Sequence, residues 1–277
     1  MKPTVAILGA GALGEILAGG LLRAGWSPDD LSLADRREER CSELTERLGV
    51  VCHLDPVLAA AGKRVVVVVV KPKDVPGLLE QIKDDIEPGQ VVLSLAAGVP
   101  LSVYEKALGE AAVVRGMPNT PALVDEAITA YAPGKHVSEE ALNEVASVME
   151  AVGKTVVLDE QLMDAVTAVS GTGPAYVYLL AEALTDAAIR EGLPRHAAQL
   201  LGDQTLKGTG ALLAETALSP IKLRAQVTSP GGTTAAAVHV LEESGFRAAI
   251  EDAVRAAAER SREMGEAAGN ASGVAGE

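Results

Sequence analysis

The sequence predicts an α/β protein, with a doubly wound parallel sheet in its N-terminal part and an all-helical C-terminal part. Three observations lead to this fold class. Short β-branched runs alternate with helical patterns through the first half of the chain, which is typical of βαβ units. The valine run at residues 65–70 shows no polar alternation, as expected for a parallel strand covered on both faces. Beyond about residue 158 the strand signal fades.

The elements expected in the first half follow in strict alternation. We expect strands at Val5–Leu8, Leu31–Ala34, 65–70, 91–95 and 112–114, with helices at 13–23 and Glu38–Leu48. A parallel sheet of this kind carries helices on both faces and binds its ligands at the carboxyl ends of its strands.

Long helices are expected in the second half, at 176–191, Arg195–Glu215 and 246–264. In the first of them Leu180 and Leu184 follow helical spacing, and Val177 and Leu179 make another side apolar as well. A helix that is apolar on most faces is either central in a domain or buried against a partner chain. We therefore expect a homo-oligomer, at least a dimer. The alternative is a helix fully buried within one subunit.

The expected domain limits follow from this change of pattern. Residues 1–158 form a dinucleotide-binding domain, and residues 159–264 form a helical domain for dimerisation and substrate. Residues 265–277 are small and polar, which predicts a disordered tail without a function. We detect no internal repeat.

Composition excludes several classes of protein. A net charge of −14 argues against a nucleic-acid partner. The longest apolar run, 65–70, is too short to span a bilayer, and no cationic leader precedes an apolar segment. These features predict a soluble cytoplasmic protein. Cys41 and Cys52 have no CxxC partner, so we expect neither a metal site nor a disulfide framework.

The strongest local motif is a glycine-rich loop between the first strand and the first helix. It reads Gly9-Ala10-Gly11-Ala12-Leu13-Gly14 and fits the pattern G-x-G-x-x-G. In this context Gly9 permits the turn, Gly11 lets the backbone approach a pyrophosphate, and Gly14 allows close packing of helix on strand. The loop therefore predicts a Rossmann-type nucleotide site.

Two signals on the choice of cofactor conflict at the end of the second strand. Asp35 lies about 20 residues beyond the loop, where an acid binds the ribose hydroxyls of NAD. Arg36 follows it and suits the 2′-phosphate of NADP, while we interpret Arg37 as a solvated residue at the start of a helix. We expect NADP as the cofactor, with NADPH favoured and NADH possible.

A further candidate lies where the valine run ends, at Val70-Lys71-Pro72. Strand carboxyl ends face the ligand in such sheets, which makes these residues candidates for cofactor binding. A plain surface lysine is an equally good interpretation of Lys71.

A second site for an anion is predicted at residues 227–234, which read Val-Thr-Ser-Pro-Gly-Gly-Thr-Thr before an apolar helix at 235–241. A glycine-rich turn leaves backbone N–H groups free, and the helix N-terminus favours negative charge. The turn lies too far along the chain to belong to the nucleotide loop. It suggests a site for a small carboxylate, the alternative being a turn that merely caps a helix.

Several segments together resemble the pyrroline-5-carboxylate reductase family. The motifs are the residues 94–99, 115–121, 169–176, 227–234 and 241–246, and the resemblance runs from Val5 to about Met264. It implies a Rossmann domain plus a helical domain that interlocks in a dimer. It also implies NADPH- or NADH-dependent reduction of the cyclic imine pyrroline-5-carboxylate to proline, the last step of proline biosynthesis.

The resemblance also assigns roles to individual residues. It adds Ala97, Gly98, Pro118 and Asn119 to the cofactor site, and it gives residues 170–174 a structural role at the entry to the helical domain. Ser229 and the backbone of Gly231, Gly232 and Thr233 hold the substrate carboxylate, and Thr234 contacts the ring nitrogen. Ser229 and Thr234 are thus the catalytic candidates. Two positions depart from the family pattern: Thr172 replaces a usual serine, and Ala225 stands where an acid is common.

The proposed chemistry fits these residues. Reducing a ketone creates an alkoxide and calls for an acid. Reducing an iminium removes charge, so a carboxylate clamp, a neutral hydrogen-bond partner and a positioned nicotinamide are sufficient. Of the four histidines, only His239 lies near a motif, and we interpret it as a satisfied or exposed helical residue.

Two other functions stay open at this point. A β-hydroxyacid dehydrogenase shares the layout but needs a lysine acid, and neither Lys207 nor Lys222 lies in a glycine-asparagine-lysine context. A nucleotide-sensing regulatory protein would keep the glycine loop but has no reason to keep a second anion-binding turn.

Overall fold

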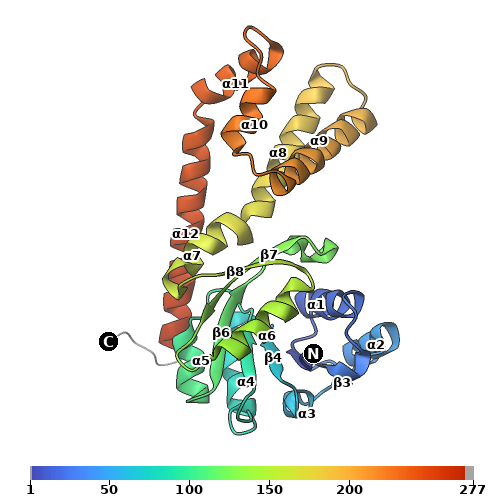
Figure 1. The fold of residues 1–277 in the computed structure, drawn as a ribbon, viewed down its shortest axis with the longest axis vertical. Coiled ribbons are helices and arrows are strands. Elements are labelled where there is room, and N and C mark those ends of the chain that lie inside the picture. Colours follow the sequence, from blue (N-terminus) through green and yellow to red (C-terminus); the bar gives the residue numbers. More distant parts are fainter. Residues whose placement is uncertain (1, 272–277) are drawn as a thin grey trace. The chain divides into compact units, whose positions relative to one another are not determined.

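The computed structural model describes residues 2–271, and its strands form one eight-stranded sheet within that range (Figure 1). The strand order is β3-β2-β1-β4-β5-β6-β7-β8. Neighbours from β3 to β6 run parallel, β7 is antiparallel to β6, and β8 is parallel to β7. The strands are β1 (Val5–Leu8), β2 (Leu31–Ala34), β3 (Cys52–His53), β4 (Val65–Val68), β5 (Val91–Ser94), β6 (Ala112–Met117), β7 (Ala127–Pro133) and β8 (Gly153–Val157).

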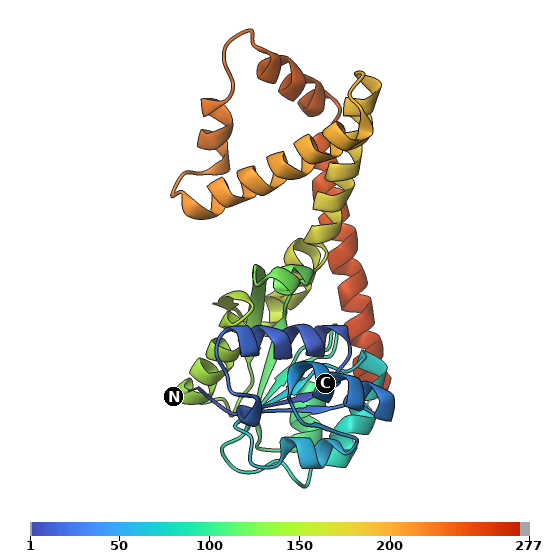
Figure 2. The same cartoon turned by 90° about the vertical axis from the view of Figure 1, so that its right-hand side faces the viewer.

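Helices cover both faces of this sheet (Figure 2). One face packs on α1 (Ala12–Arg23), α2 (Glu38–Leu48) and α6 (Glu139–Glu150), and the other on α3 (Pro56–Ala60), α4 (Val75–Ile82) and α5 (Leu101–Leu108). Alternate residues of each strand serve the two cores: Val5 and Ile7 face one, and Ala6 and Leu8 the other. The predicted fold class, a doubly wound α/β domain, is confirmed.

Several predicted elements end at different residues. Val5–Leu8, Leu31–Ala34, Glu38–Leu48 and Arg195–Glu215 match the structure. The strand expected at 65–70 ends at Val68, and Val69 and Val70, which follow it, line a cavity described below.

Strands β3, β7 and β8 were not expected, and β7 makes the sheet mixed instead of fully parallel. Local propensity does not explain the omission of β8, which ends in three β-branched residues. The segment of β7 mixes three alanines and a proline, which have low strand propensity, with Ile128, Thr129 and Tyr131, and it pairs with β6 and β8.

Five short helical turns complete this part of the chain: η1 (Pro28–Asp30), η2 (Pro72–Asp74), η3 (Thr120–Val124), η4 (Glu160–Leu162) and α7 (Met163–Val166). A π-helical turn, η5 (Thr167–Gly171), follows them. Its side chains bond back to the chain, with the Ser170 hydroxyl donating to the Val166 carbonyl at 3.0 Å and the Thr172 hydroxyl to the Thr167 carbonyl at 3.0 Å.

The described chain divides into two compact units, residues 2–172 with 257–271, and residues 173–256. We call them the sheet unit and the helical unit. The division differs from the predicted limits of 158 and 264 because Met163 and Ala168 are buried in the sheet unit. The remaining helices are α8 (Gly173–Arg190), α9 (Arg195–Glu215), α10 (Pro220–Gln226), α11 (Thr233–Glu243) and α12 (Phe246–Ala271), and the division falls within α12.

The expected disordered tail is wrong for residues 265–271, which continue helix α12. This part of α12 packs against the segment after β5: a Cβ built at Gly98 would lie 3.5 Å from Met264, and one built at Gly265 would lie 3.4 Å from the Gly98 carbonyl. The Ser261 hydroxyl also donates to Asp164 at 2.6 Å. Residues 272–277 of the predicted tail lie outside the described residues.

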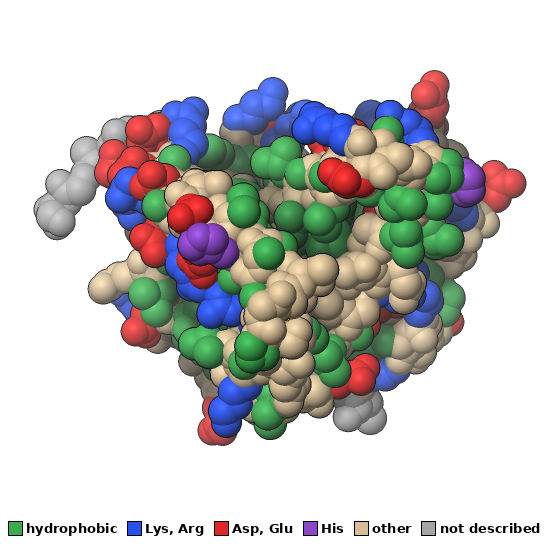
Figure 3. Space-filling view, turned by 90° about the horizontal axis from the view of Figure 1, so that it is seen from above, with side chains coloured by type: hydrophobic (Ala, Val, Ile, Leu, Met, Phe, Trp, Pro, Cys, Tyr) green, Lys and Arg blue, Asp and Glu red, His purple; other side chains and the backbone are tan. Residues whose placement is uncertain are grey.

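The helical unit lacks a core of its own. Ala198 is the one buried residue between positions 173 and 256, all of which the structure describes. Apolar side chains lie at the surface instead, as the face in Figure 3 illustrates. In α8, Leu179 is 66% exposed, which excludes a helix fully buried within one subunit. None of the helices within residues 2–271 is long and apolar enough to cross a membrane.

The expectation that Cys41 and Cys52 form no disulfide framework is also wrong. Cys41 on α2 and Cys52 on β3 form a disulfide across a Cα–Cα distance of 4.9 Å. The turn between α2 and β3 brings the two residues together, although their spacing in sequence matches no redox or metal motif. The Cys41 sulfur also lies 3.5 Å from the Asp35 carbonyl oxygen, beneath the end of β2.

Candidate functional site

The glycine-rich loop has the backbone geometry that a phosphate site requires. Gly9 has φ +113°, and a Cβ there would meet the Val69 carbonyl at 2.9 Å. A Cβ at Gly14 would lie 2.3 Å from the Gly9 oxygen, so helix α1 and the loop touch directly. Above Gly11 nothing lies within 4 Å, which leaves room for a ligand. Gly11 is also the N-cap of α1 without a side-chain cap, so the first-turn N–H groups are available to an anion.

A cavity of about 610 Å³ opens beside this loop. Of the predicted cofactor residues, it brings together Gly9, Gly11, Asp35, Arg36, Val70 and Lys71. Sequence reasoning missed the other lining residues: Leu8, Ala34, Arg37, Leu54, Pro56, Val69, Lys73, Asp74, Gly77, Leu78 and Gln81. Its volume is in the range of small-molecule and cofactor sites, and the residues present fit a dinucleotide.

The remaining predicted cofactor residues do not line this cavity. Ala10 lies in the glycine loop, Pro72 begins η2, and Ala12, Leu13 and Gly14 belong to the first turn of α1. Ala97, Gly98, Pro118 and Asn119 lie beyond the carboxyl ends of β5 and β6. Their cofactor role stays a prediction.

Asp35 and Arg37 form a close ion pair at the end of β2. One carboxylate oxygen of Asp35 accepts from the Arg37 Nε and backbone N–H, both at 3.0 Å, and the other accepts from Nη2 at 3.3 Å. Burial opposes ionisation of Asp35, but these hydrogen bonds and the charges of Arg37 and Arg40 outweigh it, so the pKa of Asp35 lies below its usual value. Arg37 is 66% exposed and is the N-cap of α2, as expected for a solvated residue at a helix start, and it also pairs with Asp35.

Arg36 is held differently. Its side chain is 84% exposed, and its Nη2 lies 3.6 Å from the Oδ2 of Asp74, which is 26% exposed. Asp74 ends η2 at the N-cap of α4, where its carboxylate makes no capping hydrogen bond. The signal that selected Lys71, its position after a strand carboxyl end, also applies to Lys73 and Asp74.

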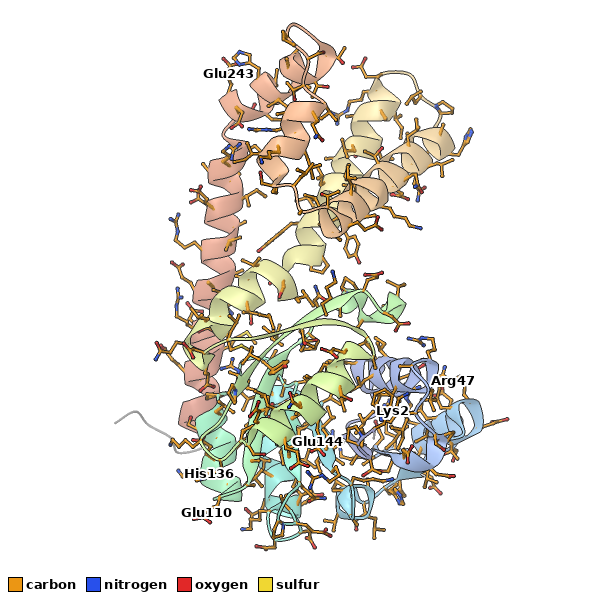
Figure 4. All side chains as sticks on the ribbon, in the orientation of Figure 1. Lys2, Arg47, Glu110, His136, Glu144 and Glu243 are labelled. Carbon is orange, nitrogen blue, oxygen red and sulfur yellow. A yellow bond between two sulfur atoms is a disulfide. The ribbon has the colours of Figure 1, made fainter. Side chains whose placement is uncertain are left out.

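Arg40 connects α2 to the glycine loop. Its Nε donates to the Ala10 carbonyl at 3.0 Å, and its guanidinium pairs with Glu15 on α1 and with Glu43. Arg47, labelled on α2 in Figure 4, reaches Glu15 as well. Side chains of α1 and α2 thus hold the Ala10 carbonyl of the glycine loop in place.

The segment after β6 is supported by hydrogen bonding and close packing. The Asn119 side-chain oxygen accepts from the Ile128 backbone N–H of β7 at 3.0 Å, and Pro118 is buried. A Cβ at Gly171 would lie 2.5 Å from the methyl carbon of Met117. Two motifs of the sequence, 115–121 and 169–176, therefore touch inside the sheet unit.

The turn at residues 227–234 belongs to the helical unit and precedes α11. The Gly232 N–H donates to the Ser229 carbonyl at 3.1 Å, with Pro230 and Gly231 between them and Gly231 at φ +69°. This is the pattern of a type II turn. A Cβ at Gly232 would lie 2.3 Å from the Ser229 hydroxyl oxygen, so a larger residue there would displace that hydroxyl.

Helix α11 begins at this turn with its N-terminus open. Gly232 is the N-cap and provides no side-chain cap, Thr233 and Thr234 are the first two helical residues, and Ser229 is exposed. The first-turn N–H groups, with the Ser229 and Thr234 hydroxyls nearby in sequence, can bind a small carboxylate.

Charged side chains near the turn form ion pairs with one another. His239 pairs with Glu243 on the same helix at 3.3 Å and is 70% exposed, in agreement with an exposed helical histidine. Arg224 and Arg247 both pair with Glu242. Ala225 lies in the last turn of α10 and is exposed.

Two family models match the chain, and they cover most of it. Residues 4–98 match the model described as NADP oxidoreductase, coenzyme F420-dependent. Residues 160–264 match the model described as pyrroline-5-carboxylate reductase dimerisation.

Curated relatives extend the similarity over the whole chain. A pyrroline-5-carboxylate reductase of Methanosarcina acetivorans is 40% identical over 94% of this chain and 97% of its own length. One from Synechocystis is 40% identical over 96% and 99%. Among solved structures, the pyrroline-5-carboxylate reductase of Coxiella burnetii superposes with a TM-score of 0.92 at 34% identity, covering 95% of this chain and 99% of that one. The Plasmodium falciparum enzyme, solved with NADP bound, gives 0.84 at 29% identity, over 95% and 98%.

Proposed function

This chain belongs to the pyrroline-5-carboxylate reductase family, and we propose that it reduces the cyclic imine 1-pyrroline-5-carboxylate to L-proline. It is an oxidoreductase that acts on a carbon–nitrogen double bond, and the reaction is the last step of proline biosynthesis. When bound, a reduced nicotinamide cofactor supplies the hydride. The protein's own task is to hold the substrate and the cofactor in place.

The observation that carries this proposal is the open N-terminus of α11 behind the Ser229–Gly232 turn. We assign the substrate carboxylate to the Ser229 hydroxyl and the N–H groups of Gly231, Gly232 and Thr233. The Thr234 hydroxyl oxygen accepts the N–H of the protonated imine. As hydride adds to the imine carbon, the electron pair moves to nitrogen and its positive charge disappears, so a neutral partner is sufficient.

We propose the cavity beside the glycine loop as the cofactor site, with NADPH favoured and NADH accepted. Four cationic side chains line it, Arg36, Arg37, Lys71 and Lys73, against the carboxylates of Asp35 and Asp74. This excess of positive charge supports binding of a 2′-phosphate. The Plasmodium falciparum relative was solved with NADP.

We further propose a dimer in which the helical units of two chains interlock. A unit with one buried residue cannot supply the apolar burial that stabilises a folded domain. Exposed apolar residues on α8 and α9, such as Leu179 and Leu200, supply the surface for a second copy. The cytoplasmic location expected from the sequence stays a prediction.

The test is a spectrophotometric assay of the purified protein with pyrroline-5-carboxylate and either NADPH or NADH. We expect both cofactors to be oxidised as proline forms, with the larger kcat/KM for NADPH. Binding of either cofactor without oxidation in the presence of the imine would contradict the proposed reaction and favour a sensor of nucleotides.

A further inference from the structure

We propose that Asp74 is a specificity-determining residue of the cofactor site, because its carboxylate competes with the 2′-phosphate of NADPH for Arg36. The inference rests on the proposed function of the cavity as a nicotinamide cofactor site. Without the Asp74 carboxylate, the protein would discriminate more strongly in favour of NADPH over NADH. Asp74 therefore limits the preference for NADPH by weakening its binding, and it leaves the binding of NADH unchanged.

The ion pair joins two segments that border the cavity from different strands. Arg36 follows β2, where the ribose end of a dinucleotide binds in sheets of this kind. Asp74 follows β4 in the turn η2, and both side chains line the cavity. Asp74 therefore faces the one arginine of the pair Arg36–Arg37 that Asp35 does not hold.

The two arginines differ in how easily a ligand can recruit them. Arg37 makes three hydrogen bonds to Asp35, two of them from its guanidinium. Arg36 has a loose ion pair at 3.6 Å and an 84% exposed side chain. Turning Arg36 toward a 2′-phosphate costs little, because exposed ion pairs contribute little to stability. Arg36 is thus the guanidinium that NADPH can recruit, and Asp74 is its competitor.

The position of Asp74 also argues against a purely structural role. The backbone of Asp74 is helical and continues from η2 into α4, and its carboxylate accepts no backbone N–H at the start of α4. Its carboxylate is turned toward Arg36 instead. In this position the negative charge repels a 2′-phosphate directly and also holds the arginine, while the neutral 2′-hydroxyl of NADH experiences neither effect.

The experiment measures dissociation constants of NADP⁺ and NAD⁺ for the full-length protein by calorimetry, at one fixed salt concentration. The adenosine fragments 2′,5′-ADP and 5′-AMP serve as matched probes without the nicotinamide. For Asp74→Asn we expect the affinity for NADP⁺ and 2′,5′-ADP to rise about fivefold, with NAD⁺ and 5′-AMP unchanged within about twofold.

Two further variants make the test specific. In an Arg36→Ala background, Asp74→Asn should produce at most half of that gain, because the carboxylate acts mainly through the arginine. Glu80→Gln is the matched control: Glu80 lies on the same helix, pairs with Lys83 at 2.6 Å and does not line the cavity. It should leave all four constants unchanged.

Three outcomes would overturn the inference while the proposed function stands. They are an unchanged NADP⁺/NAD⁺ ratio in Asp74→Asn, an equal gain for both dinucleotides, and a full gain that persists without Arg36. Failure of the unmodified protein to bind either dinucleotide would overturn the inference and the proposed function together.

Discussion

The sheet unit and the helical unit differ in how far they bury their apolar side chains within one chain. The sheet unit buries two apolar layers, one on each face of its eight strands. The helical unit buries Ala198 alone and leaves leucines of α8 and α9 at 39–69% exposure. The nucleotide cavity lies in the first unit, and the Ser229–Gly232 turn lies in the second.

This difference separates the two halves of the function. The residues proposed to hold the cofactor are fixed by a core within one chain, so we expect their geometry to survive without a partner. The residues proposed to hold the substrate lie in a unit whose exposed apolar faces, in the proposed dimer, are buried by a second copy. Cofactor binding and substrate turnover should therefore respond to different changes.

The largest effect is expected from charges on the exposed faces of the helical unit. In the double variant Leu179→Asp, Leu200→Asp we expect a monomer by light scattering, and proline formation falls roughly 100-fold or more because the unit loses its burial. Calorimetry should give NADPH affinity within about twofold of the original protein. Leu58→Asp is the control, since Leu58 is 60% exposed but belongs to the sheet unit. A fully active monomer would abolish the contrast between the units.

In the glycine loop we expect the reverse: cofactor binding is lost while the assembly state is unchanged. Gly14→Ala places a Cβ 2.3 Å from the Gly9 carbonyl oxygen, which displaces the loop at a cost of about 3 kcal/mol and weakens NADPH binding roughly 100-fold. The assembly state should stay unchanged. Gly19→Ala on the same helix is the control, because its Cβ would meet only the flexible end of Arg23, at 3.2 Å. Equal losses in both variants would mean that helix α1, not the loop contact, limits binding.

A smaller effect is expected in the substrate turn. Thr234→Ala should lower kcat about tenfold, the value of one hydrogen bond to a reacting nitrogen, and leave the dissociation constant of NADPH unchanged. Thr209→Ala, which removes a hydroxyl bonded to its own helix, should leave both values unchanged. Stopped-flow measurement of hydride transfer checks the first value. A parallel loss of cofactor affinity in Thr234→Ala would contradict its assignment to the substrate.

The sequence predicted those parts whose geometry is imposed locally. Gly9 and Gly14 were identifiable because any side chain there meets backbone. The limits of α2 and α9 matched because their ends carry clear signals, such as Gly49 in the left-handed conformation after α2. The fold class followed from the alternation of these elements.

The missed features depend on contacts between distant residues. Asp74 meets Arg36 across two strands of the sheet, and Cys41 meets Cys52 only after α2 packs beside β3. Neither pair leaves a periodic or spaced pattern in the sequence. Strand β7 is held by pairing with β6 and β8. Pairing between residues so far apart in the sequence becomes visible only in the folded structure.

The smallest effect concerns the Asp35–Arg37 pair and is confined to the sheet unit. Because the folded pKa of Asp35 lies below its unfolded value of about 3.8, ionised Asp35 stabilises the folded state above that pH, and this contribution disappears as pH falls through the folded pKa. We therefore expect Asp35→Asn to destabilise the sheet unit at pH 7 but much less at about pH 3. Urea unfolding at the two pH values measures the difference.

Arg37→Leu removes the partner and should reproduce the same pH dependence, whereas Arg23→Leu, whose partner is Asp125, leaves the Asp35 contribution intact. Between pH 5 and 8 Asp35 stays ionised, so its charge does not change the binding of NADH over that range. A stability loss in Asp35→Asn that is equal at pH 7 and pH 3 would show that packing of the side chain, and not its charge, stabilises the end of β2.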